Sequence, residues 1–195
     1  MKKLICHGDS LTQGADLDRR SAWPAQVASR LNITVINSGI GGDTTGGLLG
    51  RFYAEVVQHP ADAVLIMGGT NDLWWDLDLK LIRANIFTMA CQATHFDIIP
   101  LVGIPPPIFV EKARQQDFAG PEGGYEQLAD QLRMLVEALE LAAEQNEVAC
   151  LDFHRPFLDA TGNPVEEYFL DDGLHPNQAG HKLMADIAIE MLSGL

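Results

Sequence analysis

Short apolar segments alternate with longer segments of helical periodicity along this chain of 195 residues. Each short segment is followed by glycine, proline or a polar turn, which is typical of buried strands. The long segments carry apolar residues at helical spacing, the pattern of a helix with one buried face. The expected strands are residues 3–7, 34–37, 63–67, 97–103 and 147–152, and the expected helices are residues 22–31, 44–58, 79–94, 122–146 and 177–192.

This alternation predicts an α/β fold with a parallel sheet, because parallel strands are joined by helices that cover both faces of the sheet. Because the connections between parallel strands are right-handed, only a few strand orders are possible. We expect a flavodoxin-like three-layer α/β/α sandwich with five strands in the order 2-1-3-4-5. Residues 1–195 are expected to form a single domain, since no linker or repeat interrupts the pattern. The longest irregular segments, 104–121 and 160–171, are expected to be functional or mobile.

Polar or turn-forming motifs follow all five expected strands. In a doubly wound sheet, ligands bind beyond the carboxyl ends of the strands, so these loops are expected to meet along one rim. Their convergence indicates a functional site more strongly than any single motif does. In chain order the motifs are Gly8-Asp9-Ser10, Gly39-Ile40-Gly41-Gly42-Asp43-Thr44, Gly68-Gly69-Thr70-Asn71-Asp72, Pro105-Pro106-Pro107, and the pair Asp172 and His175.

Ser10, His175 and Asp172 are the residue types needed for acyl transfer through a covalent intermediate. A serine hydroxyl is inert at neutral pH until a base removes its proton, and histidine titrates in the right range for that task. Asp172, three residues before His175, could bond the imidazole N–H and fix its tautomer, with the neighbouring Asp171 as the lower-ranked alternative. Taken alone, the sequence Gly-Asp-Ser favours a turn serine that caps the following helix, so the role of Ser10 depends on the other motifs.

Two further residues are candidate donors to the oxyanion of such a reaction. The glycine run at 39–44 lacks the lysine and the spacing of a P-loop. One interpretation is that its glycines simply permit a tight turn. The functional interpretation is that the backbone N–H of Gly42 points at the reacting carbonyl oxygen. The amide of Asn71 would be a second donor, unless Asn71 is only a turn residue. Asp9 and Asp72 are interpreted as structural residues.

Aromatic side chains near these loops are candidates for the wall of a substrate pocket. Trp74 and Trp75 lie just beyond Asn71. Because adjacent residues point in different directions, at least one tryptophan is expected at the pocket mouth. The opposite wall is expected to contain Phe109, Phe118 and Tyr125.

Charge and cysteine usage argue against several classes of partner. The formal net charge is −14, and an acidic surface repels phosphate backbones and anionic membranes, so we expect no nucleic-acid or membrane partner. The first apolar run ends at His7, so no secretory segment or transmembrane span is expected there. Three cysteines without CxxC spacing favour reduced thiols and a cytoplasmic location over a disulfide framework or a zinc site.

Four separated blocks resemble those of the SGNH hydrolase superfamily, also called GDSL esterases and lipases, and they occur in the family's order. The resemblance implies a flavodoxin-like fold and a metal-free hydrolase with Ser10 as the nucleophile. It also implies that the backbone N–H of Ser10 joins Gly42 and Asn71 in an oxyanion hole. The blocks are Gly8-Asp9-Ser10-Leu11, Gly42 before Asp43-Thr44, Gly69-Thr70-Asn71-Asp72, and Asp172-Gly173-Leu174-His175-Pro176.

These observations lead to the hypothesis of a serine esterase that hydrolyses short-chain carboxylic esters, such as acetyl esters, through an acyl-enzyme. Its partner would be a small-molecule ester, and no cofactor is expected. Two alternatives are a metal-dependent phosphoesterase and a non-catalytic flavodoxin-like module that binds a ligand such as FMN. The metal ligands of the first alternative would be Asp9, Asn71, Asp72, Asp172 and His175.

Overall fold

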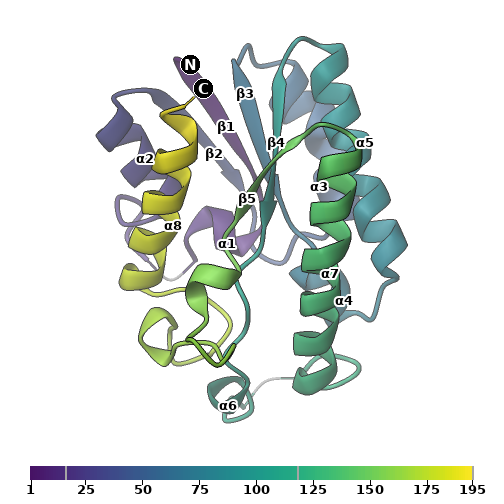
Figure 1. Ribbon diagram of the computed structural model, residues 1–195, viewed down its shortest axis with the longest axis vertical. Coiled ribbons are helices and arrows are strands. Elements are labelled where there is room, and N and C mark those ends of the chain that lie inside the picture. Colours follow the sequence, from purple (N-terminus) through teal and green to yellow (C-terminus); the bar gives the residue numbers. More distant parts are fainter. Residues whose placement is uncertain (16, 118, 195) are drawn as a thin grey trace.

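The computed structural model describes residues 1–15, 17–117 and 119–194 and contains a twisted sheet of five parallel strands (Figure 1). The strands lie in the order β2-β1-β3-β4-β5, which confirms the predicted order. Strand order reverses at β1, so the loops after β1 and β3 open a crevice at the carboxyl edge of the sheet. The strands are β1 (Lys3–Gly8), β2 (Thr34–Gly39), β3 (Ala63–Met67), β4 (Ile99–Ile104) and β5 (Ala149–Asp152).

Helices cover both faces of the sheet and complete the predicted three-layer sandwich. On one face lie α2 (Trp23–Leu31) and α8 (Gln178–Leu192), which pack against each other (Figure 1). On the other face lie α3 (Thr45–Phe52), α5 (Leu79–His95) and α7 (Tyr125–Gln145). The sheet is therefore enclosed on both sides, as a parallel sheet requires.

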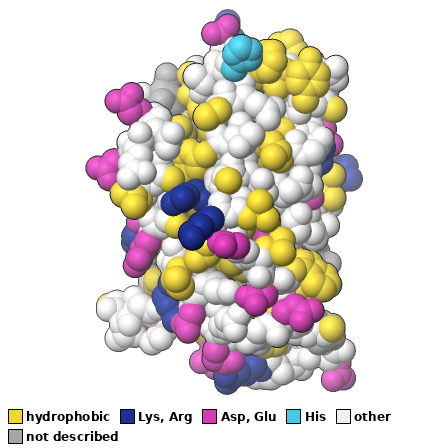
Figure 2. Space-filling model, turned by 90° about the vertical axis from the view of Figure 1, so that its right-hand side faces the viewer, with side chains coloured by type: hydrophobic (Ala, Val, Ile, Leu, Met, Phe, Trp, Pro, Cys, Tyr) yellow, Lys and Arg dark blue, Asp and Glu magenta, His cyan; other side chains and the backbone are white. Residues whose placement is uncertain are grey.

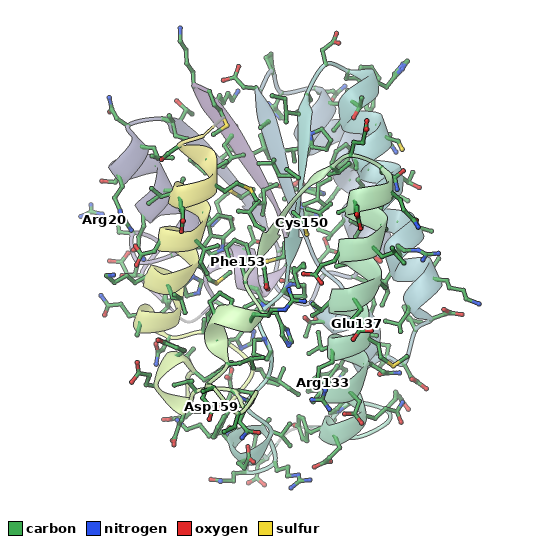
Figure 3. The ribbon with its side chains drawn as sticks, viewed as in Figure 1. Arg20, Arg133, Glu137, Cys150, Phe153 and Asp159 are labelled. Carbon is green, nitrogen blue, oxygen red and sulfur yellow. The ribbon has the colours of Figure 1, made fainter. Side chains whose placement is uncertain are left out.

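The core divides into two layers because side chains alternate along each strand. In β3, Val64 and Ile66 join the layer beneath α3, α5 and α7, whereas Leu65 and Met67 join the layer beneath α2 and α8. The second layer also holds Phe153, whose ring lies 5.5 Å from that of Trp23. In Figure 3, Phe153 lies inside the molecule, while Arg20 and Asp159 project from its periphery.

Most predicted elements differ from the structure by a few residues at one end or both, and three differences have a clear local reason. The strand predicted at 97–103 begins at Ile99, because Asp97 has a left-handed backbone (φ 57°) in the preceding turn. The helix predicted at 122–146 begins at Tyr125, because Gly124 (φ 83°) lies outside the helical region. The helix predicted at 44–58 is α3 followed by the π-helix η1 (Tyr53–Val57), a change in hydrogen bonding that apolar spacing does not encode.

Several short helical turns occupy the loops at the carboxyl edge of the sheet. The sequence pattern does not predict them, because three to five residues are too few to show a period. Two of them place residues of the candidate site, since α1 begins at Ser10 and α4 contains Asn71. The short elements are α1 (Ser10–Gln13), α4 (Thr70–Trp74), α6 (Val110–Ala113), and the 3₁₀ turns η2 (Arg155–Phe157) and η3 (Glu166–Tyr168).

The surface carries the acidity expected from the composition. Figure 2 shows acidic side chains gathered in the lower half of one face, toward the end where the strands finish in Figure 1. Within the described part of the chain, no helix combines the length and apolar character needed to cross a bilayer. Cys6, Cys91 and Cys150 are free thiols.

His181 is a buried titratable group of α8 that links folding stability to pH. Its side chain is 1% exposed, and its Nδ1 accepts a hydrogen bond from the backbone N–H of Trp23 at 3.2 Å. Burial, assisted by the charge of His175, lowers the pKa of His181 from 6.5 to about 4. As the pH falls, the unfolded chain takes up this proton before the folded chain does. The stability contributed by neutral His181 is therefore lost between pH 6.5 and about 4.

We expect His181→Gln to weaken this acid sensitivity. Between pH 6.5 and pH 5, the loss in free energy of unfolding should be about 2 kcal/mol smaller in the variant, at about 1.4 kcal/mol per pH unit. Urea unfolding at several pH values measures this difference, and comparing the two proteins cancels the titrations they share. Equal slopes in the variant and the unchanged protein would contradict the prediction.

Candidate active site

Ser10 is held at the carboxyl edge of the sheet by the turn that follows β1. Asp9 caps α1 by accepting a hydrogen bond from the backbone N–H of Leu11 at 2.9 Å, and Ser10 is the first residue of this helix. Gly14 ends α1 in a left-handed conformation (φ 79°). Ser10 is only 9% exposed, so its hydroxyl lies within an opening and not on a free surface.

The imidazole of His175 lies between Ser10 and Asp172. Its Nε2 is 3.0 Å from Ser10 Oγ, and its Nδ1 is 2.6 Å from Asp172 Oδ2. Ser10 and His175 are 165 positions apart in the sequence, so the fold creates this contact. A hydroxyl, an imidazole and a carboxylate are thus hydrogen-bonded in series, an arrangement in which the imidazole can take the proton of the hydroxyl.

The turn from Asp172 to His175 fixes the orientation of the ring. Asp172 Oδ1 accepts hydrogen bonds from the backbone N–H groups of Leu174 (2.8 Å) and His175 (3.0 Å), which leaves Oδ2 for the imidazole. Burial opposes ionisation of Asp172, but hydrogen bonds from the His175 ring and from the backbone outweigh it and lower the pKa. Asp172 is therefore an anion at neutral pH, which favours a proton on His175 Nδ1 and leaves Nε2 as the acceptor toward Ser10.

Gly42 and Asn71 border the same opening. Gly42 has φ 78°, and a Cβ there would meet no atom within 4 Å, so glycine is needed for its backbone conformation and not for lack of room. Asn71 Nδ2 donates to the carbonyl oxygen of Asp43 at 2.9 Å and lies 3.4 Å from Asp9 Oδ2. Because an amide nitrogen carries two hydrogens, one can anchor the side chain to Asp43 while the second faces Asp9.

Asp9 and Asp72 have hydrogen-bond partners within the protein. Asp72 accepts from the hydroxyl of Thr45 (2.6 Å) and from its backbone N–H (2.8 Å), so both carboxylate oxygens are engaged. Burial raises the pKa of Asp9 to about 7, although the N–H of Leu11 and the charge of His175 act in the opposite direction. In the ranges that the structure describes, no group of three or more His, Cys, Asp or Glu side chains is arranged to hold a metal ion.

A pocket of about 480 Å³ opens over these residues. Trp74 and Trp75 both line it, and Trp75 is 59% exposed, which puts an indole ring at the mouth. Sequence reasoning did not identify Leu11, Ala15 or Leu174 as lining residues. Leu11 and Leu174 directly neighbour Ser10 and His175 in the sequence, and this proximity could have identified them as residues of the pocket wall.

The opposite wall differs from the prediction. Phe109 does not line the pocket, because its ring stacks on that of Phe169 at 6.1 Å and packs with the core layer of α2 and α8. Tyr125 lies behind Trp74, with an edge contact at 6.0 Å, and does not line the pocket either. The prediction for Phe118 falls outside the described residues.

The fold and this site together define the class of protein. A serine, a histidine and an aspartate bonded in series at the edge of a sheet ordered 2-1-3-4-5 are the features of an SGNH hydrolase. Residues 6–183 match the model of the GDSL-like lipase/acylhydrolase family. The chain belongs to that family and is a hydrolase of carboxylic esters.

Known proteins similar to this chain agree with that assignment. An arylesterase of Vibrio mimicus is 28% identical over 198 residues, covering 98% of this chain and 88% of the relative. An acetylxylan esterase of Geobacillus stearothermophilus is 26% identical over 167 residues, covering 82% of this chain and 72% of the relative. The structure of a lipase/acylhydrolase from Enterococcus faecalis superposes with a TM-score of 0.81 at 23% identity, covering 100% of this chain and 96% of that one. This structural likeness supports the fold.

Proposed function

We propose that this protein is a serine esterase that hydrolyses esters of short acyl groups through an acyl-enzyme on Ser10. The observation that carries the proposal is the hydrogen-bonded series from Ser10 Oγ to His175 Nε2 and from His175 Nδ1 to Asp172. It lies at the pocket opening, where an ester carbonyl can approach the hydroxyl. No other residue is needed to activate the nucleophile.

In the proposed mechanism, His175 takes the proton of Ser10 as the hydroxyl oxygen attacks the ester carbonyl carbon. The resulting imidazolium is stabilised by the ionised Asp172. The tetrahedral intermediate collapses when His175 gives this proton to the leaving alkoxide, which departs as the alcohol. Water then attacks the acyl-enzyme, with His175 again acting first as the base and then as the acid, and the carboxylic acid is released.

The oxyanion of both tetrahedral intermediates would accept hydrogen bonds from three donors. They are the backbone N–H groups of Ser10 and Gly42 and the side-chain amide of Asn71. All three residues line the pocket beside the Ser10 hydroxyl. Loss of one such donor typically lowers turnover by about 10²–10³-fold, so the three together account for much of the rate enhancement.

The pocket supports a preference for small, uncharged esters. Its volume of about 480 Å³ must hold both the acyl group and the alcohol, and it has an exposed indole and a few small apolar side chains at its wall. Acidic side chains gather at this end of the molecule (Figure 2), which disfavours anionic substrates. The relatives named as an arylesterase and an acetylxylan esterase point to aryl acetates and acetylated sugars as the substrates to test first.

A series of p-nitrophenyl esters from acetate to palmitate tests this proposal. We expect kcat/KM to be highest for acetate or butyrate and to fall for longer chains. In a tunnel shaped for a long acyl chain, each added methylene would contribute about 0.8 kcal/mol of binding, and kcat/KM would rise through octanoate. Such a rise would contradict the short-chain preference without affecting the role of Ser10.

Two controls separate the esterase from the alternatives. A fluorophosphonate should label Ser10 and stop hydrolysis, whereas a non-catalytic binding module would neither turn over the esters nor be labelled. Activity should also survive a metal chelator, because Asp72 is bonded to Thr45 and both nitrogens of His175 face Ser10 and Asp172. Loss of activity with chelator and its return with a divalent cation would favour the phosphoesterase alternative.

A further inference from the structure

Arg51 is a largely buried cation beneath the candidate site, and the proposed mechanism does not use it. Its side chain is 15% exposed, and it projects from the last turn of α3 toward the carboxyl ends of β1 and β2. An arginine in this position must be paired to be stable, because burial of an unpaired charge is unfavourable. Its partners therefore show what the residue holds together.

The guanidinium of Arg51 joins three segments of the site through separate nitrogens. Nη2 donates to the carbonyl oxygen of Gly8 at 2.8 Å, at the end of β1. Nη1 donates to the carbonyl oxygen of Ser38 at 2.9 Å, at the end of β2, and is also paired with Glu55. Nε donates to Asp43 Oδ2 at 2.7 Å, in the loop that contains Gly42. The planar fork of arginine suits such a set of acceptors, whereas lysine has a single nitrogen.

Two of these contacts, those with Gly8 and Asp43, lie next to a candidate oxyanion donor. Gly8 is two residues before Ser10, and Asp43 directly follows Gly42. The carbonyl oxygen of Asp43 also accepts the hydrogen bond that anchors Asn71, at 2.9 Å. A single side chain thus contacts the segments that present the N–H groups of Ser10 and Gly42 and, through Asp43, the amide of Asn71.

The surroundings of Asp43 restrict its carboxylate to this pairing. A Cβ added at Gly47 would lie 1.8 Å from Asp43 Oδ1, so the carboxylate occupies the space where a side chain at position 47 would be. The Asp43 side chain is 14% exposed and salt-bridged to Arg51. His7 also contacts Arg51, because its Nδ1 lies 3.4 Å from Arg51 Nη1. Its Nε2 lies 3.0 Å from the carbonyl oxygen of Leu48.

We propose that Arg51, acting through Asp43, is a positioning residue for the oxyanion hole and so sets the turnover rate of this hydrolase. This inference rests on the proposed function. The oxyanion exists only in the tetrahedral states, so misplaced donors reduce kcat and leave substrate binding largely unchanged. Arg51 does not line the pocket, so its effect on the reaction is carried by Gly42 and Asn71.

Arg51→Lys tests the proposal because it keeps the positive charge and removes the fork. We expect kcat to fall by about 10–100-fold with KM nearly unchanged, once the concentration of active sites is titrated with a fluorophosphonate. The inhibition constant of phenylboronic acid, which forms a tetrahedral adduct with serine, should rise by a similar factor. Asp43→Ala, which removes only the link nearest to Gly42, should act in the same direction.

Arg155→Lys provides a control that removes the fork of a more exposed arginine far from the site. Arg155 is also paired with two carboxylates, Glu140 and Asp152, but it lies after β5, away from the pocket. We expect its kcat, its KM and its inhibition by phenylboronic acid to equal those of the unchanged protein. A similar loss of kcat in Arg155→Lys would mean that any arginine network affects turnover through general stability, and it would overturn the proposal.

A double-mutant cycle separates positioning from an independent effect. If Arg51 acts partly through Asn71, the loss caused by Arg51→Lys should be smaller in an Asn71→Ala background than in the unchanged protein. Full additivity, normal kcat in folded Arg51→Lys and Asp43→Ala, or failure of both variants to fold would each overturn the proposal. Its failure is distinct from failure of the proposed function, which an active Ser10→Ala or a lack of fluorophosphonate labelling of the unchanged protein would indicate.

Discussion

Ser10→Ala is expected to lower kcat for p-nitrophenyl acetate by on the order of 10⁴–10⁶-fold. The reason is that the proposed reaction forms a covalent bond to Ser10 Oγ, and alanine offers His175 no hydroxyl to activate. Residual hydrolysis would come from direct attack of water on the ester, with the oxyanion donors still stabilising the tetrahedral intermediate. The folded state should be preserved, because the hydroxyl is replaced by a smaller group at a position facing an opening.

Two measurements accompany this test. Rapid quenching with p-nitrophenyl acetate followed by peptide mass analysis should find an acetyl group on the peptide that contains Ser10, and none in the variant. Thermal unfolding should show that the variant is folded at the assay temperature. Hydrolysis by folded Ser10→Ala at the rate of the unchanged protein would remove Ser10 from the mechanism, whatever the geometry around it.

The order of the strands could be predicted because buried parallel strands and amphipathic helices leave distinct periodic patterns. β3 is a continuous apolar run because both of its faces are covered by helices. In α7, leucines recur at helical spacing because only one face of this helix is buried. The π-helix η1 could not be predicted, since it changes the backbone hydrogen bonds of a segment without changing which residues are apolar. The left-handed backbone of Asp97 could not be predicted either, because it does not change which residues are apolar.

The candidate site was predictable where chemistry restricts residue types and was not where packing decides. Ser10, His175 and Asp172 are recognisable because few side chains can serve as nucleophile, base and orienting anion. Phe109 was assigned to the wrong surface, because an aromatic ring packs equally well in a core or a pocket wall, and only its stacking on Phe169 distinguishes them. The buried position of Arg51 could not be predicted from the sequence, since the side chain of an arginine in a helix is usually exposed to solvent.

Asp172→Asn is expected to lower kcat by roughly 10³–10⁴-fold, and hydrogen bonding to the backbone explains why the isosteric change is so damaging. In the structure, Asp172 Oδ1 accepts from the N–H groups of Leu174 and His175, while Oδ2 faces the imidazole. An asparagine would keep its oxygen toward the two backbone donors. Its NH₂ group would then donate to His175 Nδ1, and the ring proton would move to Nε2. Nε2 could no longer accept the proton of Ser10.

Asp171→Asn is the matched comparison, because it makes the same chemical change one residue earlier. The Asp171 side chain is fully exposed, and its carboxylate lies 3.6 Å from Lys112 Nζ, a surface pairing of little energetic weight. We expect its kcat and KM to equal those of the unchanged protein. Fluorophosphonate labelling of Ser10 should be slowed in Asp172→Asn and normal in Asp171→Asn, because labelling requires the same base. Equal activity of the two variants would show that the carboxylate does not orient His175, and the base would then need another partner.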